Sequence, residues 1–180
     1  MTPSTQGTTR LRAELDAHGQ AMREVIASAE SLDPSSWNLR KQGGKWSPAQ
    51  VVEHLRLSYA TVRAELCGQG GFRIRTKWWQ QHLLRMLFLP KILKSGRFPK
   101  GVRATSEIRP GSGPFDRQQL LDALRHEGEQ FMKATDSPFL DRGSITHPFL
   151  GKIGLADGVR FMTQHLRHHH AQIVVRAPDA

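Results

Sequence analysis

Histidines are concentrated in one short stretch near the end of the chain. Four of the nine histidines among 180 residues lie in QHLRHHHAQI, residues 164–173. Neutral imidazole is a good ligand for zinc, nickel, iron or copper. Leu166 and Arg167 interrupt the run and apolar residues follow it, so the stretch does not resemble an affinity tag. Two interpretations are open: a metal site, or histidines that are hydrogen-bonded or exposed on a helix.

Helical geometry separates these four histidines. Residues four apart on a helix lie about 40° from each other, one turn apart. His165 and His169 have this spacing, and His168 lies about 60° to the other side of His165. His170 lies about 140° away, so we expect it on the surface. His165 and His169 lie on or beside an apolar stripe that contains Val159, Met162, Leu166 and Ile173.

A third histidine has a matching position on another predicted helix. His54 lies at the edge of the apolar stripe formed by Val51, Leu55, Val62 and Leu66. Facing helices in a bundle core commonly build metal sites. Three histidine ligands at about 2.0 to 2.1 Å leave a coordination position open, where the cation lowers the pKa of a water or thiol. His54, His165 and His169 are therefore the candidate ligands of a divalent metal.

Other catalytic signatures are missing from the sequence. We find no G-x-S-x-G, no Walker loop, no C-x-x-C and no H-E-x-x-H. Aspartate and glutamate pairs fall on predicted outer helix faces, so no general base is assigned. Cys67 is the single cysteine, which excludes an intramolecular disulfide. It lies about three and a half turns beyond His54, too far to join the site.

Four long helices are expected to position these histidines. The second has a strong start signal, with Ser47 as N-cap, Pro48 at the first helical position and Gln50 completing a capping box. Asp116 with Gln119 opens the third. Apolar periodicity, caps and breakers place the helices at residues 9–31, 47–66, 116–134 and 155–175.

The segment between the second and third long helices is an insertion, residues 68–115. It is predicted to hold one short helix over 77–89 that Pro90 ends. The stretches 97–115 and 136–154 are predicted to be irregular, and no strand-like alternation is found. The expected fold is an all-α four-helix bundle with a short extra helix in the insertion. We expect a single domain over 1–180, with an ordered core of about 9–176.

The charge of the chain is unevenly distributed. The net charge is +10, and between Glu65 and Glu107 there are nine basic residues and no acid. Aromatic and aliphatic residues are interleaved with these charges. A basic and aromatic segment, here 66–106, can dock on nucleic acid, an anionic membrane or an acidic partner. The alternative is a solvated loop and a helix whose apolar side packs on the core.

Two segments resemble one family. GGKWSPAQVVEHL, residues 43–55, and HPFLGKIGLADGVRFMTQHLRHHHAQI, residues 147–173, are similar to the second-helix entry and the last helix of the DinB-like superfamily, YfiT-like branch. The resemblance implies a four-helix bundle with a histidine triad that binds a divalent metal, usually zinc or nickel. The implied ligands are His54, His165 and His169. Leu166 departs from the polar residue that many relatives have at its position.

The resemblance also implies roles for neighbouring residues. His168 matches a family histidine outside the triad, and His147 matches a loop histidine that we expect to brace its loop. Trp46 is expected to pack over the bundle end. Arg73 or Arg75 of the insertion is a candidate for attracting an anionic thiol cofactor.

The implied function is a metal-dependent thiol S-transferase or a small-molecule hydrolase. Its partner would be a small-molecule substrate, such as a low-molecular-weight thiol, and relatives often form homodimers. The alternative is a non-enzymatic binding module whose residues 66–106 dock on nucleic acid, an anionic membrane or an acidic partner. As partners, nucleic acid and a membrane surface are less favoured than a small-molecule substrate. Without an apolar leader or an apolar run of roughly 18 residues, we expect the chain to be cytoplasmic.

Overall fold

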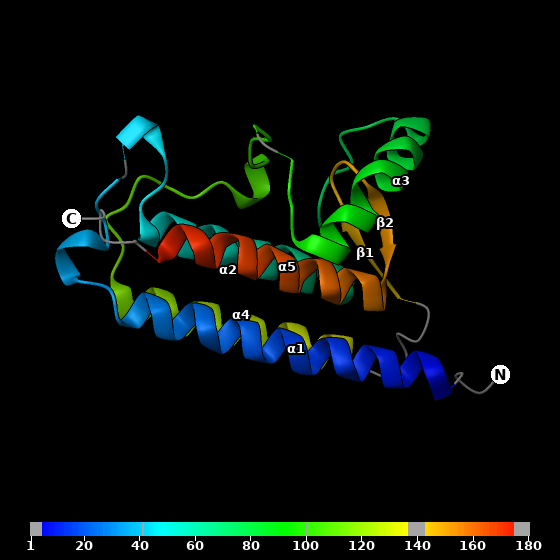
Figure 1. Cartoon of the computed structure of the whole chain (residues 1–180), viewed down its shortest axis with the longest axis horizontal. Helices are drawn as coiled ribbons and strands as arrows, with labels where there is room; N and C mark the ends of the chain where they lie inside the picture. Colours follow the sequence, from blue (N-terminus) through cyan, green and yellow to red (C-terminus); the bar gives the residue numbers. More distant parts are fainter. Residues whose placement is uncertain (1–4, 41, 100, 137–142, 175–180) are drawn as a thin grey trace.

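The computed structural model describes residues 5–40, 42–99, 101–136 and 143–174. Five α-helices and one two-stranded sheet follow each other along these residues (Figure 1). The elements are α1 (Thr5–Glu30), α2 (Pro48–Leu66), α3 (Trp78–Ser95), α4 (Arg117–Thr135), β1 (Ser144–His147), β2 (Gly151–Gly154) and α5 (Leu155–Ile173). Three short 3-10 helices lie between them: η1 (Pro34–Ser36), η2 (Gln42–Gly44) and η3 (Ser106–Ile108).

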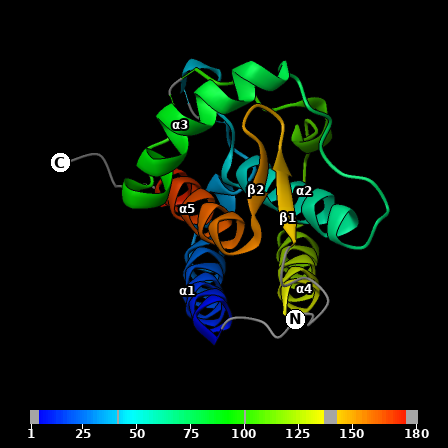
Figure 2. The same cartoon turned by 90° about the vertical axis from the view of Figure 1, so that its right-hand side faces the viewer.

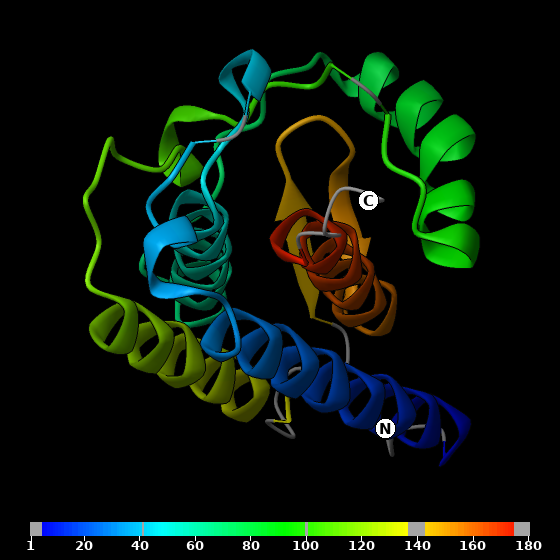
Figure 3. The same cartoon turned by 60° about the vertical axis from the view of Figure 1, so that its left-hand side comes forward.

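Four of the helices form a bundle, which confirms the expected fold class. Seen end-on in Figure 2, α5 lies over α1 and α2 lies over α4. The helix α3, the hairpin β1–β2 and η3 all lie on the α2–α5 side, away from α1 and α4 (Figure 3). The predicted stripe of α5 is buried as expected, and in α2 Val51, Leu55 and Val62 are buried while Leu66 packs partly exposed against the core.

Local signals in the sequence set the helix starts correctly. The Ser47 hydroxyl accepts from the Gln50 N–H at 3.2 Å, and the Gln50 side chain accepts from the Ser47 N–H at 3.2 Å. At the start of α4, the Asp116 carboxylate accepts from the Gln119 N–H at 2.8 Å. These contacts satisfy amide groups that the first helical turn leaves without partners. The helices α2 and α4 therefore begin where the sequence predicts.

The predicted end of the insertion helix at residue 89 is wrong. The helix α3 continues through Pro90 to Ser95. A proline inside a helix removes one hydrogen bond and crowds the carbonyl four residues earlier, which here belongs to Met86. Pro90 and Met86 both lie on the exposed side of α3, where water can solvate that carbonyl. Beyond the proline, Ile92 is buried against the core, which favours continuation of the helix.

The prediction of no strands was also wrong. The strands β1 and β2 pair antiparallel, with Ile145 opposite Ile153. Both isoleucines are buried, and Ile145 packs closely against Gly158 of α5. Glu65 of α2 accepts hydrogen bonds from the backbone and side chain of Thr146. Strands of four residues carry too little alternation to be recognised, so this hairpin depends on tertiary packing.

Both outer helix boundaries differ slightly from their predicted positions. The first helix begins at Thr5 rather than at residue 9 and ends at Glu30. The last helix ends at Ile173, and the predicted end at residue 175 lies outside the described residues. Differences of this size are common where helix ends fray. Within the described residues, no helix combines the length and the apolar character needed to cross a membrane.

The centre of the bundle contains a tyrosine hydroxyl without a hydrogen-bond partner among the described residues. Tyr59 is fully buried, and burial raises its pKa well above the usual value. A buried polar group without a partner costs about 1 to 3 kcal/mol. We therefore expect Tyr59→Phe to raise the free energy of unfolding by about 1 kcal/mol, measured by urea denaturation. Tyr59→Leu is the control, because it also removes ring packing and should destabilise. A loss of stability in Tyr59→Phe would show that the hydroxyl is bonded in solution.

Candidate metal centre

Three histidines from two helices meet between α2 and α5. The Nε2 atom of His165 lies 3.2 Å from Nε2 of His54 and 3.0 Å from Nε2 of His169. One potential ligand atom from each of the three residues lies within 4.8 Å of the others. The structure thus brings together the three residues that the sequence singled out, and this group could hold a metal ion.

Helix packing fixes the positions of these side chains. His54 is followed by Leu55 and His165 by Leu166, and both leucines are fully buried in the core. Each leucine anchors its helix, so the adjacent histidine is held at the edge of the α2–α5 contact. The ring of Trp46 lies 4.9 Å from the His54 ring, between centroids. Trp46 therefore packs directly on a candidate ligand, near the N-terminal end of α2.

Hydrogen bonds orient two of the three imidazoles. Nδ1 of His54 donates to the backbone carbonyl of Ile108 at 2.7 Å, and Nδ1 of His169 donates to the side-chain oxygen of Gln172 at 3.0 Å. Both acceptors are carbonyl oxygens, so the proton of each neutral ring is on Nδ1. The Nε2 atoms of His54 and His169 then carry lone pairs that point toward His165. Partners of this kind typically orient histidines that bind metal.

The resulting donor set suits a cation. Nε2 of a neutral His165 can donate to one of its two neighbours but not to both. The lone pair of the other neighbour would then lie close to 3 Å from a nitrogen that has no second proton to donate. A cation bonded to all three nitrogens removes this conflict. With metal–nitrogen bonds of about 2.0 to 2.1 Å, tetrahedral geometry separates the nitrogens by about 3.3 Å and octahedral geometry by about 2.9 Å. The observed separations of 3.0 and 3.2 Å lie between these values.

Burial keeps the three imidazoles neutral, which is the form that binds metals. Burial lowers the pKa of His54 to about 4 and that of His169 to about 3. The pKa of His165 is held well below its usual value by burial first, and then by the neighbouring His169 and His54. All three side chains are therefore uncharged at pH 7, and no proton has to leave before a cation binds.

The group has three members and no fourth ligand among the described residues. No carboxylate or thiol joins the three histidines there, and Cys67 is exposed at the end of α2. Aromatic rings lie nearby instead: Phe98 is 5.8 Å and Phe161 is 6.5 Å from His165, between ring centroids. Three histidines with an open position are typical of catalytic sites, because structural zinc sites are usually closed by four ligands.

The other histidines of the two segments have distinct roles. His168 is half-buried beside Phe98 and accepts a hydrogen bond from the Gln172 amide at 3.2 Å. Nδ1 of His147 accepts from the N–H groups of Phe149 and Leu150, each at 3.2 Å, so it braces the turn between β1 and β2 as expected. The surface position predicted for His170 is wrong. It is half-buried and its Nε2 lies 2.7 Å from the Ser28 hydroxyl of α1.

Two expectations for charged residues need revision. Glu53 is buried rather than on an outer face, and Arg56 holds its carboxylate through two hydrogen bonds of 2.7 and 2.8 Å. Arg75 pairs with Glu107 at 2.8 Å. The guanidinium of Arg75 therefore already has an anionic partner, whereas Arg73 is exposed.

Sequence reasoning missed the groups that orient the ligands. The Ile108 carbonyl comes from η3, and a backbone acceptor leaves no signature in residue types. Phe98 follows α3 and approaches the site only through the fold. Gln172 could have been found, because it lies three residues after His169 and one position before a buried isoleucine on the same helix.

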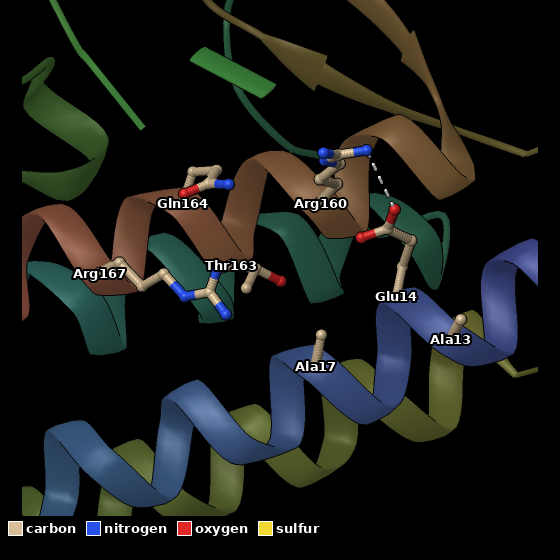
Figure 4. A pocket seen from close by; sticks show the side chains of 7 residues that line it. All are labelled: Ala13, Glu14, Ala17, Arg160, Thr163, Gln164 and Arg167. Carbon is tan, nitrogen blue, oxygen red and sulfur yellow. Dashed lines mark ion pairs between the residues drawn. The ribbon is translucent and has the colours of Figure 1, made fainter. Parts of the chain in front are cut away.

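A hollow of about 270 Å³ between α1 and α5 is not the metal centre. Figure 4 shows the seven side chains that line it: Ala13, Glu14, Ala17, Arg160, Thr163, Gln164 and Arg167. None of the three histidines is among them. Arg167 is rotated about 200° from His165 on α5, so the hollow and the histidine group lie on opposite sides of this helix.

Gln172 provides a test of ligand orientation. We expect Gln172→Leu to lower the affinity for zinc or nickel by about 10- to 100-fold, because His169 loses the acceptor that fixes its tautomer. A competition titration against a chromogenic chelator measures this change. Gln20→Leu is the matched control, because Gln20 is an exposed glutamine on α1. Equal affinities in both variants would mean that Gln172 does not orient His169.

The fold and the site together define the class of protein: a four-helix bundle that gathers three histidines from two of its helices. The sequence model of the DinB superfamily matches residues 14–173, and the chain belongs to this superfamily. Metal binding is frequent among its members, which agrees with the histidine group. No curated protein and no solved structure matches the chain.

Proposed function

We propose that the protein is a divalent-metal-dependent enzyme that holds zinc or nickel through His54, His165 and His169. The observation that carries this proposal is the convergence of the Nε2 atoms of three neutral histidines, of which His54 and His169 are buried and His165 is partly buried, with no fourth ligand among the described residues. Membership of the DinB superfamily supports it.

The residues of the chain would prepare this site in three ways. The Ile108 carbonyl and Gln172 hold the lone pairs of His54 and His169 toward one point. Trp46 and Phe98 exclude water from the sides of the site that their rings cover. Burial keeps the imidazoles neutral. A divalent cation held there would supply Lewis acidity, which lowers the pKa of a thiol or a water.

The reaction is thiol S-transfer or the hydrolysis of a small molecule. In S-transfer, the sulfur of a low-molecular-weight thiol forms a bond to an electrophilic carbon. The leaving group departs with its bonding electron pair, and the thiol proton passes to solvent. In hydrolysis, the oxygen of water replaces the sulfur. Both reactions need a nucleophile whose pKa is lowered toward neutrality, and this need is met by one open position beside three neutral ligands.

The metal content of the purified protein tests the first half of the proposal. Elemental analysis should give close to one divalent metal per chain for the native protein and far less for a variant with all three histidines replaced by alanine. A variant with His126→Ala, His168→Ala and His170→Ala changes the same number of histidines outside the group and should keep its metal. Equal, substoichiometric metal in native and triad variants would refute the site.

A substrate screen tests the second half. The loaded protein is incubated with electrophiles and several low-molecular-weight thiols, and both thiol loss and product mass are followed. S-transfer consumes thiol, whereas hydrolysis in isotopically labelled water introduces labelled oxygen into the product without a thiol. Metal binding without either outcome would leave a metal-binding protein and refute the enzymatic proposal.

A further inference from the structure

The helix α3 is apolar on two opposite sides. One side packs inward: Ile92 is buried, and Leu84, Phe88, Leu89 and Leu93 pack partly exposed against the core. The other side carries four large apolar residues, here called the α3 outer face: Trp79, Leu83, Met86 and Leu87, which are 50%, 46%, 73% and 51% exposed. Trp78, at the first helical position, is 74% exposed. A helix that is hydrophobic all round normally has both sides covered.

The outer face is a continuous strip. Trp79, Leu83 and Met86 follow each other at spacings of four and three residues, so they lie along one side of the helix over about two turns. The helix lies on the outside of the molecule, on the side away from α1 and α4 (Figures 2 and 3). Among the described residues, nothing covers this strip. Exposed apolar strips of this kind mark interaction sites.

The charges around the strip have one sign. Lys77 stands at the N-cap of α3, and Lys91, Lys94 and Arg97 follow the strip toward and beyond its C-terminal end. All four are exposed, and the sequence from 66 to 106 contains no acid. Arg85 is committed elsewhere, because it donates to the carbonyl of Lys152 in β2. The strip is therefore bordered by exposed cations at both ends.

This charge pattern argues against a second copy of the chain as the occupant. A twofold interface places the same patch of each subunit against the other. Two copies of this segment, which carries four exposed cations and no acid, would repel each other. The partner should therefore be anionic.

The apolar content distinguishes between anionic partners. Nucleic acid is bound mainly by cationic and polar side chains to its phosphates, and an aliphatic strip of leucine and methionine has no counterpart there. An anionic lipid surface offers both components, acyl chains for the strip and headgroup phosphates for the cations. Tryptophan favours this water–lipid boundary, and helices with such a face lie in the plane of the interface.

We propose that α3 docks flat on an anionic lipid surface. The α3 outer face enters the boundary between headgroups and acyl chains, and Lys77, Lys91, Lys94 and Arg97 contact the headgroup phosphates. This contact is independent of the histidine group, so it can hold whether or not the protein is an enzyme.

Vesicle binding of the full chain tests the docking. The protein should sediment with vesicles that contain phosphatidylglycerol and much less with vesicles of phosphatidylcholine alone. The tryptophan emission should shift to the blue on binding, because Trp78 and Trp79 are the exposed tryptophans while Trp37 is buried and Trp46 is partly buried. Binding should weaken as the salt concentration rises.

Two variants separate the apolar and the electrostatic contributions. Leu83→Glu with Met86→Glu should lower the partition coefficient by at least about 100-fold, because two anchors become charges of the wrong sign. Lys91→Gln with Lys94→Gln should lower it by about 30-fold, because each cation contributes about 1 kcal/mol, or about fivefold. The controls are Leu39→Glu, which changes an exposed leucine outside α3, and Lys133→Gln on α4. Circular dichroism verifies that all four proteins fold.

Three results would overturn the proposal. The first is equal binding of anionic and neutral vesicles, or binding that the α3 variants do not alter. The second is tighter binding to duplex DNA than to vesicles, which would assign the cations to nucleic acid. The third is a dimer that Leu83→Glu with Met86→Glu dissociates, because it would show that a second copy covers the strip.

Discussion

Replacement of His169 by alanine is expected to lower the affinity for zinc or nickel by at least about 100-fold. Loss of a group that merely orients a ligand already costs about 10- to 100-fold, and His169 is itself a proposed ligand. Its Nε2 lies 3.0 Å from that of His165, so its removal leaves two nitrogen ligands, one from His54 on α2 and one from His165 on α5. His54→Ala should have an effect of the same size, because it removes the contribution of α2 entirely.

The same variants should lose stabilisation by metal. A ligand present at about 100 times its dissociation constant stabilises the folded state by about 2.7 kcal/mol. For a chain of this length, each kcal/mol shifts the midpoint of thermal unfolding by about 2 to 4 °C. Native protein should therefore melt about 5 to 11 °C higher at this metal concentration, whereas the His169→Ala protein should shift by no more than about 1 to 2 °C. Thermal scans with and without added metal measure the difference.

His168→Ala is the matched control for these measurements. His168 neighbours His169 in the chain, is half-buried and lies outside the group of three. Its replacement should leave the metal affinity within about tenfold of the native value, since it is at most a supporting residue. A loss as large as that of His169→Ala would place His168 among the ligands. Unchanged affinity in His169→Ala would refute the proposed ligand set.

The candidate ligands could be predicted because helical periodicity relates residues that are close in sequence. A spacing of four places His165 and His169 one turn apart in any helix. Their inward orientation follows from Leu166, which the apolar stripe places in the core. His54 required one further step, the comparison of two stripes on two helices. The long helices were predictable for the same reason, because their caps and stripes are local.

The parts that depend on distant contacts could not be predicted. The Ile108 carbonyl reaches His54 only because η3 folds over α2, and nothing in the residues around position 108 indicates this. His170 lies on the predicted outer side of α5 but meets Ser28, because α1 covers that side. The hairpin holds through Glu65 and two buried isoleucines rather than through strand propensity. In each case the deciding partner is far away in the sequence.

One acid-sensitive point of the bundle outside the metal centre is expected to be His18. It is fully buried on α1, against Tyr59 of α2, Phe131 of α4 and Thr163 of α5. The Thr163 hydroxyl donates to the Val159 carbonyl at 3.0 Å, so it can only accept from Nδ1 of His18, 3.3 Å away. The proton of the neutral ring is therefore on Nδ1, and Nε2 has no hydrogen-bond partner among the described residues.

Burial lowers the pKa of His18 from 6.5 to about 4 in the folded protein. Above pH 6.5 the ring is neutral in both folded and unfolded chains, and stability does not depend on it. As the pH falls from 6.5 toward 4, the unfolded chain gains a proton that the folded chain does not accept. The free energy of unfolding therefore decreases over this window, by about 3 kcal/mol at its lower end.

His18→Phe should remove this sensitivity while preserving an aromatic ring beside Tyr59 and Phe131. The measurement is the free energy of unfolding from urea titrations at several pH values between 4 and 7. The difference between variant and native protein should be constant above pH 6.5 and should shift by about 3 kcal/mol in favour of the variant by pH 4. Other buried histidines titrate in both proteins, so their contributions cancel in this difference. His126→Gln, at an exposed histidine of α4, is the control for the loss of one imidazole. A parallel curve for His18→Phe would mean that the folded protein accepts the proton on His18 without cost.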